Sequence, residues 1–202
     1  GGGSWGGNPW PWNPVQAGDS PGNASPVLAQ SNTGSEIYVK TQPLQWALNN
    51  VLSEAYMEQW ISLSGNVATV RNRFTNARSD TTQYAISYGS GHSWQELPAM
   101  YTNTTLTHLM TYNGTQPFTN GAATEIAHTN WTSWYATESW AAYVNDSNWG
   151  LGVYTPGAML FTGGFVGSAG GGPYSGSTSF IAPRRPEIID YNIVYDYSYN
   201  LI

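Results

Sequence analysis

Residues 56–75 read YMEQWISLSGNVATVRNRFT, and this stretch decides the fold class. Side chains alternate along Tyr56–Leu63, the turn formers Ser64-Gly65-Asn66 follow, and alternation resumes in 67–75. Two alternating runs joined by a short glycine-containing turn predict a β-hairpin. In the second run, Val70, Asn72 and Phe74 share one face and the two arginines share the other.

A second alternating run closes the chain, at residues 188–201. Tyrosines and aliphatic residues occupy every second position from Tyr191 to Leu201, and mostly polar residues lie between them. A period of two over so many residues predicts a strand with one buried face. Further strands are predicted at 36–41, 82–87, 99–101, 105–112, 134–135, 139–145, 150–155, 160–165 and 179–182, whereas 45–51 fits a strand or a helical turn equally well. About ten short strands without a convincing helix predict an all-β antiparallel sandwich with little or no helix.

The domain organisation follows from composition. Residues 1–35 are rich in Gly, Pro, Asn and Ser and carry Trp5, Trp10 and Trp12, and their prolines oppose both helix and central strand. We expect a loop-like N-terminal segment over 1–35 that packs on a single β-sandwich domain at 36–202. The glycine-rich tract at 167–173 matches no phosphate-binding pattern and is expected to be a spacer.

Charge excludes several classes of partner. Six basic against twelve acidic residues leave a net charge of −6, and charged residues make up 9% of the 202 residues. Nucleic acids and anionic membrane surfaces both require clustered Lys and Arg, so neither is an expected partner. No apolar run is long enough for membrane insertion. The three histidines lack metal-ligand spacing and cysteine is absent, so we expect no metal and no cofactor.

Aromatic residues point to a ligand class. Ten Trp and fourteen Tyr stand against five Phe, which favours rings that are half in water. The ordinary alternative is that a large sandwich simply fills its core with them. A sugar needs a flat apolar platform for its C–H face together with charged acceptors for its hydroxyls. Partly exposed rings beside carboxylates therefore predict recognition of an oligosaccharide or polysaccharide.

Two clusters combine rings with acids. Residues 90–98 place His92, Trp94 and Glu96 on one side of an extended chain, next to Tyr101. The alternative role for Glu96 is an ion pair with Arg71, Arg73 or Arg78 that holds the sandwich together.

Residues 130–140 carry three tryptophans and Glu138. As glycoside hydrolysis uses two carboxylates, Glu96 and Glu138 form the predicted catalytic pair, with His92 beside them. The predicted stacking residues are Trp94, Trp134, Trp140, Trp149 and Tyr101. Asp146 is expected to cap a β-turn.

Five Asn-x-Ser/Thr sequons predict a secreted, extracellular glycoprotein, since glycosylation acts on exported chains. They lie at Asn23, Asn103, Asn113, Asn130 and Asn145.

Several motifs resemble a group of extracellular domains of microbes and algae. The matching stretches are 60–67, 70–80, 95–101, 137–142, 149–154, 161–165, 181–183 and 187–197. These relatives look like the galactose-mutarotase-type β-supersandwich, so the resemblance implies that fold and a role in carbohydrate recognition. Two departures stand out. The relatives carry further strands before the Trp-Asn-Pro segment, and their Arg-x-Gln-Glu-Leu-Pro stretch reads Ser93-Trp94-Gln95-Glu96 here.

Three functions remain open. The first is an extracellular carbohydrate-binding domain. The second is a glycoside hydrolase or related carbohydrate-active enzyme that uses Glu96 and Glu138. The third is a glycosylated structural subunit of a filament or surface layer, in which identical or companion chains complete the sheet by strand addition.

Overall fold

A computed structural model describes residues 4–5, 8–9, 13–79, 95–96, 98–103, 105–127, 132–166, 178–185 and 192–202. These residues form strands and turns, with antiparallel pairing throughout and no helix, so the predicted all-β sandwich class is confirmed. Within this part of the chain, no helix could cross a membrane and no group of His, Asp and Glu side chains is arranged to hold a metal ion.

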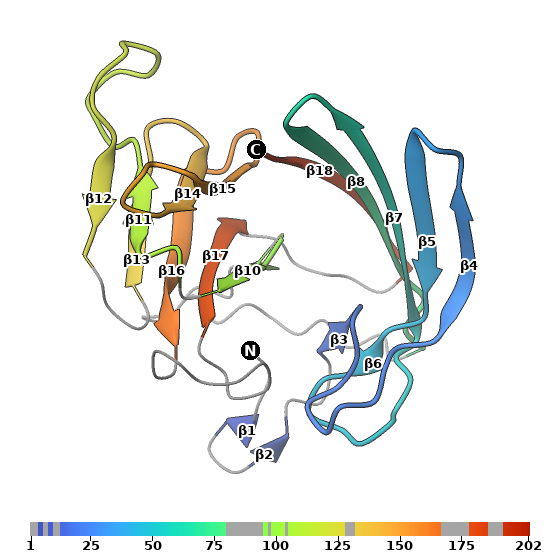
Figure 1. The fold of residues 1–202 in the computed structure, drawn as a ribbon. Helices are drawn as coiled ribbons and strands as arrows, with labels where there is room; N and C mark the ends of the chain where they lie inside the picture. Colours follow the sequence, from blue (N-terminus) through green and yellow to red (C-terminus); the bar gives the residue numbers. More distant parts are fainter. Residues whose placement is uncertain are drawn as a thin grey trace. The chain divides into compact units, whose positions relative to one another are not determined.

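The chain divides into two compact units, which are described separately. The first unit comprises Gly1–Gly65, Thr69–Ala85 and Ile188–Ser198. Its main sheet has the strand order β8-β7-β5-β4, with the first part of β18 beside β8 (Figure 1). Its strands are β1 (Ser4–Trp5), β2 (Asn8–Pro9), β3 (Pro14–Val15), β4 (Val27–Asn32), β5 (Glu36–Thr41), β6 (Leu44–Gln45), β7 (Ala55–Ser64), most of β8 (Val67–Asn76) and most of β18 (Val194–Leu201).

The predicted hairpin is confirmed as β7 and β8. Gly65 lies in the turn with φ +58°, a left-handed conformation that glycine adopts without strain. In β8, Val70, Asn72 and Phe74 are buried and the residues between them are exposed. Arg73 on the exposed face donates to Asp196 of β18 through Nε and Nη2, at 2.8 and 3.1 Å.

The N-terminal segment is less loop-like than predicted. Val27–Asn32 forms β4 and pairs with β5, so the expectation of a loop throughout 1–35 was wrong there. All six residues of β4 are exposed. A strand exposed on both faces has no need of alternation, and this explains why period-two analysis missed it.

The second unit comprises Asn66–Ala68, Ile86–Glu187 and Tyr199–Ile202. One sheet has the order β12-β11-β14-β15, with the end of β18 beside β15, and the other has the order β10-β17-β16-β13, with β9 also paired to β17. Its strands are β9 (Gln95–Glu96), β10 (Met100–Asn103), β11 (His108–Thr111), β12 (Thr124–Ile126), β13 (Thr132–Tyr135), β14 (Trp140–Val144), β15 (Gly150–Tyr154), β16 (Leu160–Val166) and β17 (Thr178–Arg185).

The two sheets of the second unit pack face to face through Tyr143. This β14 residue is fully buried, and its ring meets Phe165 of β16 edge-on at 5.1 Å. Its hydroxyl donates to the carbonyl oxygen of Gly164 at 2.8 Å. The inner face of β16 and its neighbours therefore carries Trp134, Phe161 and Ile181, all of which are buried.

The other strand predictions differ in extent. Residues 105–112 contribute only His108–Thr111 as a strand, and β12 was not predicted. Residues 45–51 form neither of the expected alternatives, because only Leu44–Gln45 is a strand and turns follow it. The predicted strand at 82–87 and the tract at 167–173 lie outside the described residues.

Candidate functional site

One face of the β17 sheet gathers polar and aromatic side chains from five strands. In antiparallel sheets, directly opposed residues lie on the same face. Glu96 of β9 is opposite Arg184 of β17, Arg184 is opposite Leu160 of β16, and Leu160 is opposite Tyr135 of β13. By the same rule Ser133 and Thr162 share this face, and so do Tyr101 and Phe180. We call it the β17 face, and its functional side chains are Glu96, Tyr101, Ser133, Tyr135, Thr162 and Arg184.

Hydrogen bonds confirm that these side chains share a face. The Thr162 hydroxyl accepts from Nη1 of Arg184 at 3.1 Å and lies 2.7 Å from the Ser133 hydroxyl. A guanidinium and two hydroxyls thus form one connected row across β17, β16 and β13. Thr162 is 4% exposed, so its hydroxyl links Arg184 to the exposed Ser133 and fixes both side chains in place.

Two phenol rings flank this row. Tyr135 is 70% exposed and Tyr101 is 56% exposed. The ring of Tyr101 lies 6.1 Å from that of Phe180, which is fully buried and directly opposite it on β17. Partial burial raises the pKa of Tyr101, and the charge of Glu96 adds to the rise. The phenol therefore remains protonated and able to donate at neutral pH.

Glu96 has an arginine opposite it, but not one of those predicted. The residue across the strand pair is Arg184. Arg71 lies 4.0 Å from Glu36, and Arg73 pairs with Asp196. Cross-strand opposition of unlike charges stabilises a sheet modestly, and Glu96 and Arg184 are both half-buried.

Glu138, the second predicted catalytic carboxylate, is engaged by neighbouring groups. Its Oε1 accepts from the backbone N–H of Phe118 at 2.7 Å, and its Oε2 accepts from the indole N–H of Trp140 at 2.9 Å. Both carboxylate oxygens therefore hold neighbouring groups in place. Glu138 follows β13 and precedes β14, and no contact joins it to the β17 face in the described part of the chain.

The predicted stacking residues do not form one surface. Trp134 is 8% exposed and stacks on Phe161 at 5.9 Å, so the expectation that it offers a face to a ligand was wrong. Alternation along β13 allows only one of Trp134 and Tyr135 to face outward, and Tyr135 does.

Trp140 and Trp149 belong to the opposite side of this sandwich. Trp140 lies on β14 directly opposite Tyr154, with the buried Tyr143 on the other face of the same strand. Trp149 lies in the turn before β15 and is 70% exposed. Of the remaining predicted residues, His92 and Trp94 lie outside the described residues.

The asparagines of the sequons differ in how many hydrogen bonds their side chains already make. Asn23 Nδ2 donates to both Asp19 and Asn49, each at 2.9 Å, so a glycan there would break bonds that hold the N-terminal segment. Asn113 and Asn145 use only their Oδ1 atoms, which accept from Thr124 and from backbone N–H groups respectively. Asn103 ends β10, and Asn130 lies outside the described residues.

Sequence reasoning missed Arg184, Ser133, Thr162 and Tyr135. No local pattern marks them, because they come from three separate strands, β13, β16 and β17, and only the pairing of these strands brings them together.

Comparison with known proteins finds similarity only at the level of structure. No family model matches the chain, and no curated protein matches its sequence. A galactose mutarotase related enzyme from Lactobacillus acidophilus aligns with a TM-score of 0.42 and 10% identity, over 89% of this chain and 70% of the other. A protein from Synechocystis sp. PCC 6803 aligns with a TM-score of 0.43 and 11% identity, over 88% and 65%. The structural neighbours thus include galactose mutarotase-related proteins at low identity.

Proposed function

We propose that the chain is an extracellular carbohydrate-binding domain and that the β17 face binds an oligosaccharide or polysaccharide. The observation that carries this proposal is the connected Arg184–Thr162–Ser133 row between two exposed phenol rings. Sugar C–H faces pack on such rings, and sugar hydroxyls exchange hydrogen bonds with guanidinium, hydroxyl and carboxylate groups. Glu96 supplies the carboxylate.

Binding is better supported than hydrolysis. The proposed acid–base pair requires Glu138 to face the same ligand as Glu96, yet both Glu138 oxygens are engaged by Phe118 and Trp140. Within the described residues, the β17 face therefore offers one carboxylate, which suffices for recognition but not for the two-carboxylate mechanism.

Ring removal tests the proposal. The variants Tyr101→Ala and Tyr135→Ala are expected to weaken binding of soluble glucan, galactan or alginate in native gels that contain the polymer. Trp149→Ala is the matched control, since Trp149 and Tyr135 are equally exposed, at 70% each. If retardation is lost in Trp149→Ala but kept in both tyrosine variants, the β17 face is not the binding site and binding occurs near Trp149.

Export can be tested through the sequons. We infer that the protein is secreted, and the contacts above predict which sites accept a glycan. In a eukaryotic secretory host, Asn113 is expected to be occupied and Asn23 to remain unmodified, as peptide mapping before and after deglycosylation would show. Glycan on Asn23 in folded protein would contradict this expectation.

A second candidate function is assembly by strand addition, and β4 favours it. All six β4 residues are exposed and uncharged, and no described strand pairs with the outer edge of β4. Edges that avoid pairing normally carry charge or proline. If β4 of a second copy paired antiparallel with β4, no charged side chains of the two strands would repel each other, although each chain carries a net charge of −6.

Light scattering over a dilution series tests this second function. Self-association is expected to disappear in the double variant Ala29→Lys with Ser31→Lys and to persist in Thr69→Lys, which adds charge at an exposed position of β8. A wild-type chain that stays monomeric at high concentration would exclude assembly through β4.

A further inference from the structure

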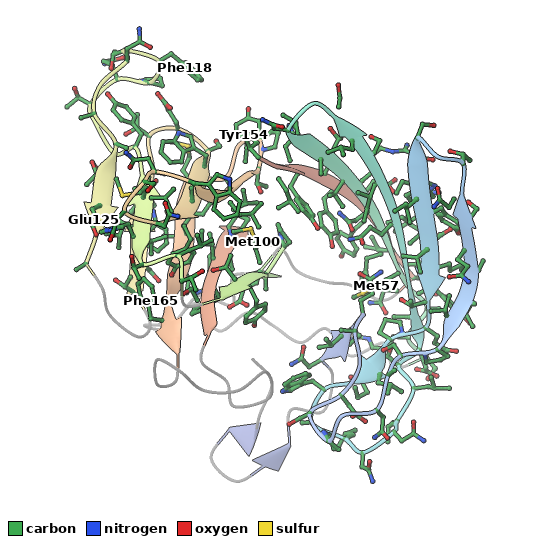
Figure 2. All side chains as sticks on the ribbon, in the orientation of Figure 1. Met57, Met100, Phe118, Glu125, Tyr154 and Phe165 are labelled. Carbon is green, nitrogen blue, oxygen red and sulfur yellow. The ribbon has the colours of Figure 1, made fainter. Side chains whose placement is uncertain are left out.

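The loop between β11 and β12 ends in an exposed phenylalanine. Phe118 is 83% exposed, more than any other large apolar side chain in the described part of the chain. Figure 2 shows its ring at the tip of this loop, and in Figure 1 the loop extends beyond the ends of the two strands. Burial within the second unit therefore gives no reason for an aromatic residue at this position.

The backbone conformation at position 118 is also unusual for phenylalanine. Its φ is +58°, in the left-handed region that residues with a Cβ avoid. That conformation costs roughly 1–2 kcal/mol for an L-residue and is usually taken by Gly or Asn. Glycine and asparagine occur elsewhere in the same loop, but the tip carries Phe. Strain of this kind occurs often where a side chain is presented for binding.

Contacts from outside the loop hold the tip in place. Glu138 accepts the Phe118 N–H at 2.7 Å while its other oxygen accepts from Trp140, which lies on β14. The backbone N–H of Phe118 is thus tied to the sheet beneath it. The hydroxyl of Thr137 also donates to the carbonyl oxygen of Gly114, near the start of the loop.

Tyr112 organises the inside of the loop. Its buried hydroxyl donates to the Gln116 carbonyl oxygen at 3.1 Å and lies 2.7 Å from the Thr119 hydroxyl. A Cβ atom added at Gly114 or Gly121 would come within 2.3 or 2.8 Å of the Tyr112 side chain, so the loop winds closely around this phenol. Phe118 is therefore presented by a preorganised loop.

The chemistry of the loop selects one class of partner. Residues 113–123 contain no charged side chain, and Gln116 and Asn120, two residues before and after Phe118, are exposed. A membrane surface is disfavoured, because one ring without nearby Lys or Arg anchors weakly and the chain carries −6. An exposed aromatic plane in a loop with uncharged amide side chains matches the C–H face and the hydroxyls of a neutral sugar.

We propose that the Phe118 loop is a second carbohydrate-contacting site, which stacks its ring on a neutral polysaccharide. This inference rests on the proposed function and adds a contact that lies apart from the β17 face. The loop extends from the β11 sheet, whereas the β17 face belongs to the other sheet of the second unit. A polymer that contacts both positions gains affinity by avidity, and a short oligosaccharide cannot.

Substitutions at the tip separate stacking from simple apolar contact. Phe118→Ala removes the ring, Phe118→Leu keeps an apolar side chain without an aromatic plane, and Phe118→Tyr keeps the plane. Native gels containing laminarin, xyloglucan or arabinogalactan would report polymer binding, and calorimetry with a tetrasaccharide of the retarding polymer would report the short ligand. Phe118→Ala and Phe118→Leu are expected to lower polymer affinity at least about tenfold, because the polymer would then be held at one site and lose the gain from avidity. Phe118→Tyr is expected to bind like wild type.

The anchor is tested with a matched glutamate pair. Glu138→Ala is expected to weaken polymer binding as Phe118→Ala does, because it frees the tip from the sheet. Glu125→Ala, on the adjacent strand β12, is expected to leave binding unchanged. Unfolding midpoints measured alongside would show that each variant is folded under the conditions of the gel.

Two sets of outcomes keep the proposals apart. Tetrasaccharide binding that is unchanged in Phe118→Ala but lost in Tyr101→Ala supports both sites. Polymer affinity of Phe118→Ala equal to wild type would overturn the loop proposal alone. Wild-type polymer affinity in Phe118→Leu would also overturn it, since the contact with the polymer would then not require an aromatic plane. Tetrasaccharide binding indifferent to Tyr101 and Tyr135 would instead overturn the β17 face, and failure of every neutral polymer to retard the wild type would overturn the loop proposal as well.

Discussion

Alternation along a strand decides which side chains share a face, and this grouping can be predicted from the sequence. In β8 the residues that alternation assigns to one face, Val70, Asn72 and Phe74, are all buried. In β13 the same rule separates Trp134 from Tyr135, but sequence does not show which of the two faces the core. The answer depends on Phe161 of β16, against which Trp134 packs.

Phe118 supports a prediction about strain. Phe118→Gly is expected to be at least as stable as wild type, because glycine adopts φ +58° freely and the exposed ring contributes little burial. It is expected to exceed Phe118→Ala by about 0.5–1 kcal/mol in free energy of unfolding, since alanine keeps the strain. Urea denaturation measures the difference. An alanine variant more stable than the glycine variant would contradict the strained backbone.

Strands were predictable where one face is apolar and the other polar, or where the whole run is apolar. The hairpin β7–β8, β5 and the strands of the second unit from β14 to β16 lie where alternation or apolar runs place them. β4 and β12 were missed because strands at a sheet edge are shaped by their one neighbour, and their own sequences carry little pattern. Residues 194–201 alternate as expected, but Ile193 just before them is 37% exposed, so the predicted buried face does not extend that far back.

His108 joins three elements of the second unit and provides a pH-dependent contact. Its Nδ1 lies 2.8 Å from Glu125 of β12, and its Nε2 lies 2.8 Å from Asp146 in the turn after β14. A neutral imidazole donates from one nitrogen only, so both contacts are satisfied only by the protonated ring. The hydrogen bond to Asp146, and next that to Glu125, raises the pKa of His108.

A titration follows from this geometry. Because the pKa in the folded state is raised above the unfolded value of about 6.5, the stabilisation is fully present below that value. It is lost as the pH rises through the folded pKa. Asp146→Asn and Glu125→Gln are each expected to lower the pKa of His108 in an NMR titration of the imidazole nitrogens. As the Asp146 side chain is 94% exposed, added salt is expected to reduce the shift. A wild-type pKa at or below the unfolded value would rule out the paired arrangement.

On the scale of the whole molecule, packing between sheets depends on few polar contacts. Tyr143 on β14 reaches across the second unit to the Gly164 carbonyl oxygen on β16. Burial raises the pKa of this phenol, so it remains a donor throughout the physiological range.

Tyr143→Phe is therefore expected to cost about 1–2 kcal/mol in free energy of unfolding, because a buried hydrogen bond is lost while the ring packing stays. Tyr135→Phe, at an exposed position, is the control and is expected to leave stability unchanged. Denaturant midpoints compare the two, and equal stability of both variants would show that this bond does not contribute to packing of the sheets.

The amino-acid sequence by itself determined the β class, the central hairpin and the alternation of the last strand, since these depend on side-chain spacing along a few residues. Its composition is also the source of the proposal that the ligand is a sugar. Only the tertiary structure decided which rings face solvent and which polar groups meet. The β17 face joins residues 96, 133, 162 and 184, and the physical reason is that strand order arises from pairing between distant segments. The contact between Glu138 and Phe118 also depends on the tertiary structure. The Glu138 carboxylate, which the sequence suggested as a catalytic group, accepts a hydrogen bond from the backbone of a loop residue twenty positions earlier.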